Sequence, residues 1–255
     1  MYISMNLLII SDLHIGNNDH FATFGWNADD FIKALEMIKH EEHIDKIILN
    51  GDIFELYKYS FDEVYQTNQK LIDYFIDQDF VMLKGNHDAI CSLGEDNFTI
   101  VNSKGKRILI EHGHSADFLN GTRLGRRLQT MGFNILRWLC KYSWALNTYF
   151  RIIEYDDAIN HIPKKYDSYK YLKYALNMLK THDLVILGHT HKIESHKTYY
   201  MNNKKQYINS GSCSLGRFEA VIVDTETMKH ETIKFKNKNA LIKEYRKTPV
   251  LAMTA

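Results

Sequence analysis

The sequence predicts an α/β protein with a β-rich carboxyl-terminal part. Short apolar runs rich in Ile, Leu and Val alternate with segments of helical period along the 255 residues. The runs are apolar at four or five consecutive positions, which is typical of strands covered on both faces. Near the end of the chain, strand-like runs follow one another with turn-like spacers and no helix between them.

The first part of the chain alternates strands and helices. A strand at 6–10 precedes a helix in the run ADDFIKALEMIKHEEH, where Phe31, Leu35 and Ile38 recur on one helical face. The strand KIIL then precedes a helix at 61–79, and the strand FVML follows that helix. This alternation is typical of the α/β class.

The second part begins with the strands FTIV and KRILIEHGH and continues with a helical region from about 122 to 180. The strand LVILGHTH follows, and the β-rich end comprises the runs KTYYM, QYINSGS, FEAVIVD and HETIKF. The chain has only two prolines and no Gly/Ser-rich linker, so nothing in the sequence indicates a domain boundary. We therefore expect one domain over 1–255, with a helical insertion at about 120–180.

Composition restricts the classes of partner and compartment. The formal net charge is +1, so no global field attracts nucleic acid or an anionic membrane. The three cysteines are widely separated, which argues against a disulfide framework or a structural zinc site and favours a reducing cytoplasm. The amino-terminal segment lacks a basic leader, and its apolar run is far shorter than the roughly 20 residues of a membrane span. A cytoplasmic protein is the expectation.

Polar side chains that can bind metals follow five of the predicted strands. They are Asp12 and His14, Asp52, Asn86 with His87 and Asp88, His112 with His114, and His189 with His191. In open α/β sheets, ligands bind at the carboxyl ends of the strands. Each fragment alone is ambiguous, because Gly-Asp is common turn chemistry and a lone histidine is more often hydrogen-bonded than metal-bound. The whole set, in order, predicts a two-metal hydrolytic site with oxygen and nitrogen ligands.

The runs SDLH, NGDIFE, KGNHD, EHGH and GHTH resemble the five ordered motifs of the calcineurin-like metallophosphoesterases, from about Asn6 to beyond Gly211. The resemblance implies a four-layer α/β/β/α sandwich, with two mixed sheets flanked by helices. It also implies two divalent ions, Mn²⁺ first and Fe or Zn as alternatives. One ion would be held by Asp12, His14 and His191, the other by Asn86, His112 and His189, with Asp52 bridging both.

The same resemblance implies a mechanism for hydrolysis of a phosphomonoester, phosphodiester or pyrophosphate. A metal-bridging hydroxide would attack phosphorus in line. His87 would bind a phosphate oxygen or protonate the leaving alkoxide, and Asp88 would orient the His87 imidazole. His114 could face the substrate or be a partly exposed loop residue.

A basic and aromatic stretch lies between the fourth and fifth motifs. It starts with Arg123, Arg126 and Arg127, contains Phe and Trp residues between its cations, and has no acidic residue before Glu154. The stretch could cap the site and hold a phosphorylated amphiphile through these arginines, or lie on the anionic inner face of a membrane. A helical hairpin packed on the sandwich, with a solvated basic face, explains the pattern equally well.

The substrate stays open at this point. The insertion is similar to the helical cap of the UDP-2,3-diacylglucosamine pyrophosphohydrolases, which would imply a lipid-linked nucleotide sugar, although members of that branch often have arginine where this chain has His87. A nucleic-acid phosphodiesterase is a second alternative, disfavoured by the near-neutral charge. A non-catalytic scaffold on the same fold is a third, disfavoured by the intact ligand set.

Overall fold

The computed structural model describes residues 4–117, 122–160 and 167–245, and within them the strands form two five-stranded mixed sheets. In spatial order, the first sheet consists of β10 (His230–Phe235), β9 (Phe218–Asp224), β1 (Asn6–Ile10), β2 (Lys46–Asn50) and β3 (Val81–Leu83). The second consists of β4 (Phe98–Val101), β5 (Arg107–Ile110), β6 (Leu184–Leu187), β8 (Asn203–Ser210) and β7 (Ile193–Tyr200). The trios β1–β2–β3 and β5–β6–β8 are parallel, and the outer pairings are antiparallel.

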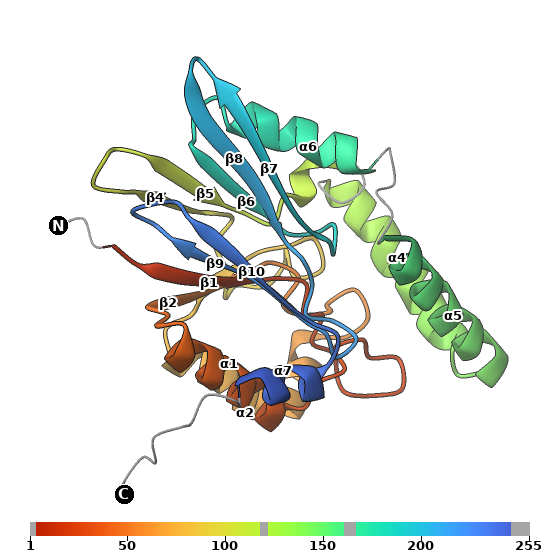
Figure 1. Ribbon diagram of the computed structural model, residues 1–255. Coiled ribbons are helices and arrows are strands. Elements are labelled where there is room, and N and C mark those ends of the chain that lie inside the picture. The colour runs from red at the N-terminus through yellow and green to blue at the C-terminus, as the bar shows by residue number, and fades with distance from the viewer. Residues whose placement is uncertain (1–3, 118–121, 161–166, 246–255) are drawn as a thin grey trace, which may run out of the picture.

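Helices cover the outer face of each sheet. The first sheet carries α1 (Ala28–Glu41), α2 (Phe61–Asp77) and α7 (Lys238–Tyr245), and the second carries α6 (Asp167–Met178) (Figure 1). The starts of α1 and α2 follow local rules, because Asn27 caps the first and a Ser60–Glu63 capping box starts the second. The order of layers is helix, sheet, sheet, helix, so the predicted α/β sandwich is confirmed.

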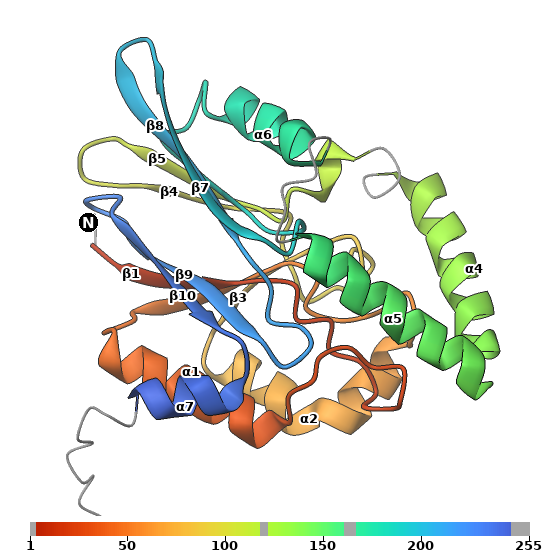
Figure 2. The same ribbon diagram turned by 45° about the vertical axis from the view of Figure 1, so that its right-hand side comes forward.

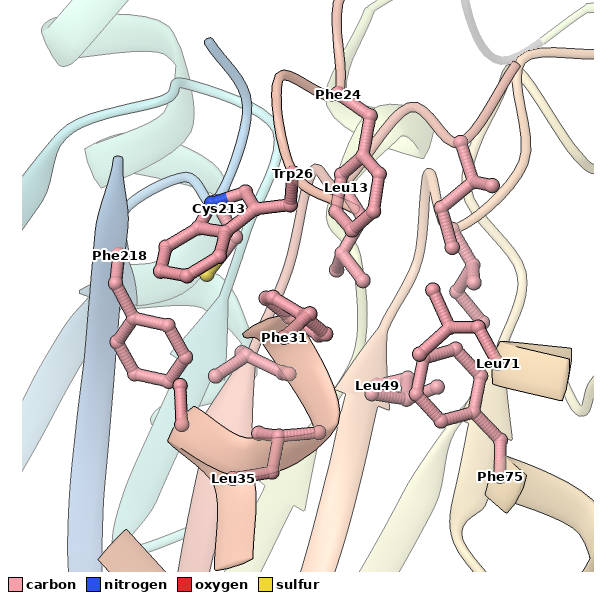
Figure 3. Close-up of a cluster of buried hydrophobic side chains, with 14 of the residues drawn as sticks. Leu13, Phe24, Trp26, Phe31, Leu35, Leu49, Leu71, Phe75, Cys213 and Phe218 are labelled. Carbon is pink, nitrogen blue, oxygen red and sulfur yellow. The ribbon is translucent and has the colours of Figure 1, made fainter. Parts of the chain in front are cut away.

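Strand β1 shows why the central strands are apolar at every position. Leu7 and Ile9 pack between the two sheets, against Ile108, Ile110 and Ile186 among others. Leu8 and Ile10 point the other way, into the larger cluster under α1 and α2. Figure 3 shows part of that cluster, including Phe31 and Leu35 of α1, Leu71 and Phe75 of α2, and Phe218 of β9. Both faces of the strand are therefore buried, as the continuous apolar run predicts.

The predicted insertion forms helices between β5 and β6. A short 3₁₀ helix, η1 (His114–Ala116), follows β5, and α4 (Arg123–Leu139), α5 (Ser143–Asn160) and α6 come next. Helices α4 and α5 lie at one end of the sandwich, where they meet at the turn that joins them and diverge from it (Figures 1 and 2). Positions 120–121 and 161–166 of the predicted insertion lie outside the described residues. Among the helices that are described, none is long and apolar enough to cross a membrane.

Candidate metal centre

The predicted metal ligands lie at adjoining edges of the two sheets. Asp12 and His14 follow β1, Asp52 follows β2, and Asn86 follows β3, all at the carboxyl ends of parallel strands. His112 follows β5, and His189 and His191 follow β6 in the facing sheet. The main chain joins the two edges, because the His189 amide donates to Asp12 Oδ2 over 3.0 Å.

Five of these residues have a left-handed backbone. The φ angles are +54° at Asp12, +51° at His14, +50° at Asp52, +70° at His189 and +55° at His191. A residue with a Cβ pays roughly 1–2 kcal/mol to adopt this conformation. Such strain gathered at one place is typical of a functional site, because the sharp turns aim side chains away from the strand direction and toward one point.

The side chains form two clusters of metal-ligand type. Asp12, His14 and His191 make one, and Asp52, His112 and His189 make the other; within each cluster the ligand atoms lie within 4.8 Å of one another. In the first, Nε2 of His191 is 3.1 Å from Asp12 Oδ1 and 3.3 Å from Nε2 of His14. In the second, Nε2 of His112 is 3.2 Å from both Asp52 Oδ2 and Nδ1 of His189.

The donor set fits two divalent ions. Asn86 Oδ1 is buried and has no hydrogen-bond partner among the described residues, which is costly for an amide oxygen unless a ligand satisfies it. Nδ1 of His112 donates to the Asn50 carbonyl over 2.9 Å, which leaves Nε2 of that ring free to bind a metal. Carboxylate, amide and imidazole donors without thiolate suit manganese, iron or zinc.

Charge in the centre is balanced between carboxylates and imidazoles. Burial raises the pKa of Asp52, but the neighbouring His112 and His87 outweigh burial, so this pKa lies well below its usual range. Burial lowers the pKa of His112, but Asp52 and Asp12 raise it to about 10. Burial and then His112 lower the pKa of His189 to about 3. Asp52 is therefore a carboxylate anion and His189 a neutral imidazole at neutral pH, the forms in which both residues bind metals.

The carboxylate that contacts His87 is Glu55. Its Oε1 lies 2.7 Å from Nδ1 of His87, and its Oε2 lies 3.4 Å from Nδ1 of His14. Burial lowers the pKa of His87, but Glu55 and Asp52 together raise it above its ordinary value. The imidazole is thus held in its protonated form, with Nε2 at the metal centre, 3.9 Å from Asp52 Oδ2. Sequence analysis missed Glu55, although it lies in the NGDIFE motif, three residues after Asp52.

The expected contact between Asp88 and the His87 ring is wrong. Asp88 Oδ2 accepts the backbone amides of Ile53 and Phe54 over 2.6 and 3.2 Å, and Oδ1 accepts that of Gly85 over 2.6 Å. Both oxygens are therefore occupied by main chain. Asp88 joins the loop after β2 to the loop after β3, and its effect on His87 is only through the backbone.

A cavity of about 950 Å³ opens beside the metal centre. Asn86 and His87 lie on one wall, and α4 forms the opposite wall with Arg123, Arg126 and Arg127, followed along the helix by Met131, Ile135 and Trp138. The Nε atom of Arg126 is buried and has no hydrogen-bond partner among the described residues. His114, the remaining predicted substrate residue, packs against His112 with 5.6 Å between ring centroids, and it does not line this cavity.

Comparison with known proteins decides the family. Residues 5–193 match the family model of calcineurin-like phosphoesterases. The chain belongs to this family. It is therefore a metal-dependent phosphohydrolase, and its predicted family is confirmed.

The phosphoesterase is also similar in fold to several solved structures. An archaeal phosphodiesterase is 19% identical (TM-score 0.43; 91% of this chain and 100% of that chain covered). A dimetal phosphatase from Danio rerio is 10% identical (TM-score 0.45; 91% and 99%), and the phosphoesterase YfcE from E. coli is 12% identical (TM-score 0.42; 90% and 98%). No curated protein matches the chain.

Proposed function

We propose that this phosphoesterase binds two divalent ions and hydrolyses a phosphodiester or pyrophosphate bond in an amphiphilic substrate. Asp12, His14 and His191 would hold one ion, Asn86, His112 and His189 would hold the other, and Asp52 would bind both. The two clusters and the unpartnered Asn86 oxygen support this assignment. Mn²⁺ is the first candidate, because the donors are oxygen and imidazole nitrogen. When bound, the ions supply an acidified water as nucleophile and offset charge on the phosphoryl group.

The protein's own groups complete the chemistry. His87 is half-buried at the mouth of the cavity, and Glu55 on Nδ1 leaves Nε2 free to face the substrate. The carboxylate stabilises the imidazolium, so His87 can donate to a phosphate oxygen and give its proton to the leaving group. His87 and Glu55 thus serve as the proton donor and the group that orients it.

The observation that supports an amphiphilic substrate is the lining of the cavity. Its arginines lie beside the metal centre, and its apolar residues continue along the same face of α4. A second phosphate or another anionic group next to the reacting phosphorus would pair with Arg126, whose buried Nε is otherwise unpaired among the described residues. An aliphatic chain would extend along Met131, Ile135 and Trp138.

The exposed side of α4 supports the proposal that such substrates come from a membrane. Large apolar side chains recur at i, i+4, i+7, i+11 and i+14, and all are more than half exposed: Leu124, Leu128, Met131, Ile135 and Trp138. Met131, Ile135 and Trp138 of this stripe also line the cavity, so a lipid surface in contact with α4 would lie next to the cavity, and the flanking arginines would attract an anionic one. A cytoplasmic protein that lies against the inner face of a membrane would receive its substrate directly through the open cavity.

Hydrolysis of bis-p-nitrophenyl phosphate and p-nitrophenyl phosphate tests the reaction. The metal-free protein is supplied with Mn²⁺, Zn²⁺ or Fe²⁺, beside Asp52→Ala. We expect turnover that needs metal and disappears in the variant. Two bound ions without turnover of either ester would mean that the site accepts only its own substrate, whereas a protein that binds no metal would contradict the proposed centre.

A second experiment tests the substrate class. UDP-2,3-diacylglucosamine is compared with UDP-glucose, which carries the same pyrophosphate without acyl chains, in wild type and Ile135→Asp. We expect the acylated compound to have the lower KM, and the variant to raise this KM without affecting UDP-glucose. Equal KM values for both compounds would contradict the proposal that the substrate is amphiphilic. Preference for a single-stranded oligonucleotide would favour a nucleic-acid phosphodiesterase instead.

A further inference from the structure

A lysine is buried beside the pair formed by Glu55 and His87. The side chain of Lys58 is 3% exposed, and its Nζ lies 3.1 Å from Glu55 Oε2. Glu55 thus has His87 on one oxygen, and Lys58 together with the more distant His14 on the other. Burying an ammonium group is costly unless the group is paired, so a buried lysine at this place indicates a specific role beside the His87–Glu55 pair.

The ammonium of Lys58 is surrounded by three aromatic rings from different parts of the chain. Its Nζ lies 5.0 Å from the ring centroid of Phe21, in the loop after β1, and 5.6 Å from those of Phe133 and Tyr149. Phe133 belongs to α4 and Tyr149 to α5. Helices α4 and α5, which we call the cap, therefore contribute two of the three rings. The ring contacts attract the ammonium of Lys58 and exclude water from it.

The backbone of the same lysine is also bound by the cap. Arg137 of α4 donates from Nη1 to the Lys58 carbonyl over 2.7 Å, and its guanidinium lies 4.7 Å from the ring centroid of Tyr59. Its Nη2 reaches Glu63 at the start of α2 over 3.3 Å. The cap is thus docked on the segment that carries Glu55 and Lys58, through contacts to both the main chain and the side chain of Lys58.

Lys58 restricts what the Glu55 carboxylate can do. Without Lys58, Oε2 of Glu55 would keep only the longer contact of 3.4 Å to Nδ1 of His14, so the carboxylate could rotate and attract water. The His87 imidazole would then lose its fixed direction. With Lys58 on the second oxygen, the carboxylate is held at both ends. Because water is excluded around the ammonium, this attraction is stronger than it would be at the surface.

We propose that Lys58 is a positioning residue that makes the hydrolytic step depend on docking of the cap. The rings of α4 and α5 hold its ammonium against Glu55, and Glu55 in turn holds His87 toward the phosphoryl group. The cap then contributes to catalysis on every substrate, including those too small to reach the cavity wall. This inference rests on the metallophosphoesterase reaction, and it is independent of the proposed amphiphile.

Kinetics of Lys58→Met with bis-p-nitrophenyl phosphate test the proposal, since methionine keeps the length of the side chain and removes its charge. We expect kcat to fall roughly 10- to 100-fold, as for other groups that orient a catalytic residue, with KM and bound metal unchanged. Lys58→Arg keeps the charge and should recover part of the loss. Unchanged kcat in a folded, metal-loaded Lys58→Met, or a rise in KM alone, would overturn the proposal.

Lys205→Met is the matched control. Lys205 is also buried and ion-paired, 3.0 Å from Asp183, but it lies at the opposite end of the second sheet from His189. This control should lose stability and keep its kcat per folded molecule. Equal losses of kcat in both variants, in proportion to unfolding, would show that Lys58 is only structural.

A separate pair of variants tests whether catalysis depends on the contact between the cap and Lys58. This test remains possible if Lys58→Met does not fold. Tyr149→Leu removes a ring that touches Lys58, and Tyr149→Phe keeps that ring but loses the hydroxyl group, which also hydrogen-bonds Lys58. We expect kcat for bis-p-nitrophenyl phosphate to fall several-fold in the first variant and to fall less in the second, which keeps the ring. A kcat that is the same in both would contradict the dependence on the cap.

Discussion

Glu55 Oε1 lies 2.7 Å from Nδ1 of His87, although the two residues are 32 positions apart in the chain. The acidic residue next to His87 in sequence, Asp88, is bound to backbone amides instead. The group that orients the imidazole therefore comes from the loop after β2. Since that loop also carries Asp52, one short segment positions both the proposed bridging ligand, Asp52, and the proposed proton donor, His87.

Glu55→Gln should lower kcat more than it lowers metal binding. Glutamine can still accept from His87, but it carries no charge to stabilise the imidazolium, so we expect a roughly 10- to 100-fold loss of kcat. Steady-state kinetics with bis-p-nitrophenyl phosphate, together with metal analysis of the same samples, measure this. Glu36→Gln, at an exposed position of α1, is the control. A variant with normal kcat would show that His87 needs no carboxylate partner.

Gly85→Ala should disrupt the metal centre because there is no room for the added methyl group. A Cβ at Gly85 would meet the Asp52 side chain and lie 2.7 Å from its Cγ, so the bridging carboxylate would have to move. We expect loss of at least one bound ion and about 1–3 kcal/mol of stability, the usual range for overpacking. Metal analysis and urea unfolding provide the measurements.

Gly132→Ala is the matched control for this substitution. A Cβ at Gly132 has no neighbour within 4 Å, and the residue lies inside α4. Alanine should therefore leave metal binding intact and raise the helix stability by roughly 0.5–1 kcal/mol. Full metal occupancy in Gly85→Ala would mean that the loop after β3 adjusts easily, contrary to this expectation.

The convergence of the proposed metal ligands could be predicted from sequence, because each lies shortly after a continuous apolar strand. Parallel strands bring their carboxyl ends to one edge, so a local pattern such as the one before Asp12 or Asp52 already indicates where a side chain will lie. The partner of His87 could not be predicted in this way. It depends on three backbone amides that occupy Asp88, and these come from two loops that meet only in the folded chain.

Strand boundaries show the same limit. The run KTYYM predicts a strand starting at Lys197, but β7 already begins at Ile193. Its first residues, Ile193 to His196, form no apolar run; they are extended because they pair with Ile208 and its neighbours in β8. At the same end of this β7–β8 pairing, β8 ends at Ser210, two residues before the end of the predicted run QYINSGS, and the next residue, Gly211, has a φ of +79°. Pairing with β8, which is not a local property of the sequence, therefore determines where β7 begins.

Asp183→Asn should destabilise the fold in a pH-dependent way without affecting catalysis. Burial raises the pKa of Asp183, but the Arg107 amide and the ammonium groups of Lys205 and Lys106 outweigh it, so the pKa is lowered. A lowered pKa means stability that is present above the unfolded value of about 3.9 and lost as pH falls below it. Solvent partly screens the pair, so we expect a loss of about 1–2 kcal/mol at pH 7.

Urea unfolding at several pH values between 7 and 3.5 measures this loss. The difference between wild type and Asp183→Asn should narrow toward the acidic end, because wild type then begins to lose the same interactions. A difference that stays constant with pH would mean that the carboxylate charge contributes nothing. Normal kcat in the variant is expected, since Asp183 lies at the end of β6 remote from His189.

Arg126→Ala should separate substrates with one phosphate from those with two. The buried Nε of Arg126 is unpaired among the described residues, and the side chain lines the cavity next to Asn86 and His87. A charge-assisted bond to a second phosphate in this desolvated position contributes about 1.5–3 kcal/mol, equivalent to a rise in KM of roughly 10-fold or more when it is lost. We therefore expect a higher KM for UDP-glucose and little change for p-nitrophenyl phosphate.

Arg151→Ala, at an exposed position of α5 outside the cavity, is the control for loss of a cap cation and should change the KM of neither substrate. A rise in KM that is equal for both substrates would place Arg126 at the reacting phosphate itself, and no change for either would remove it from the substrate site.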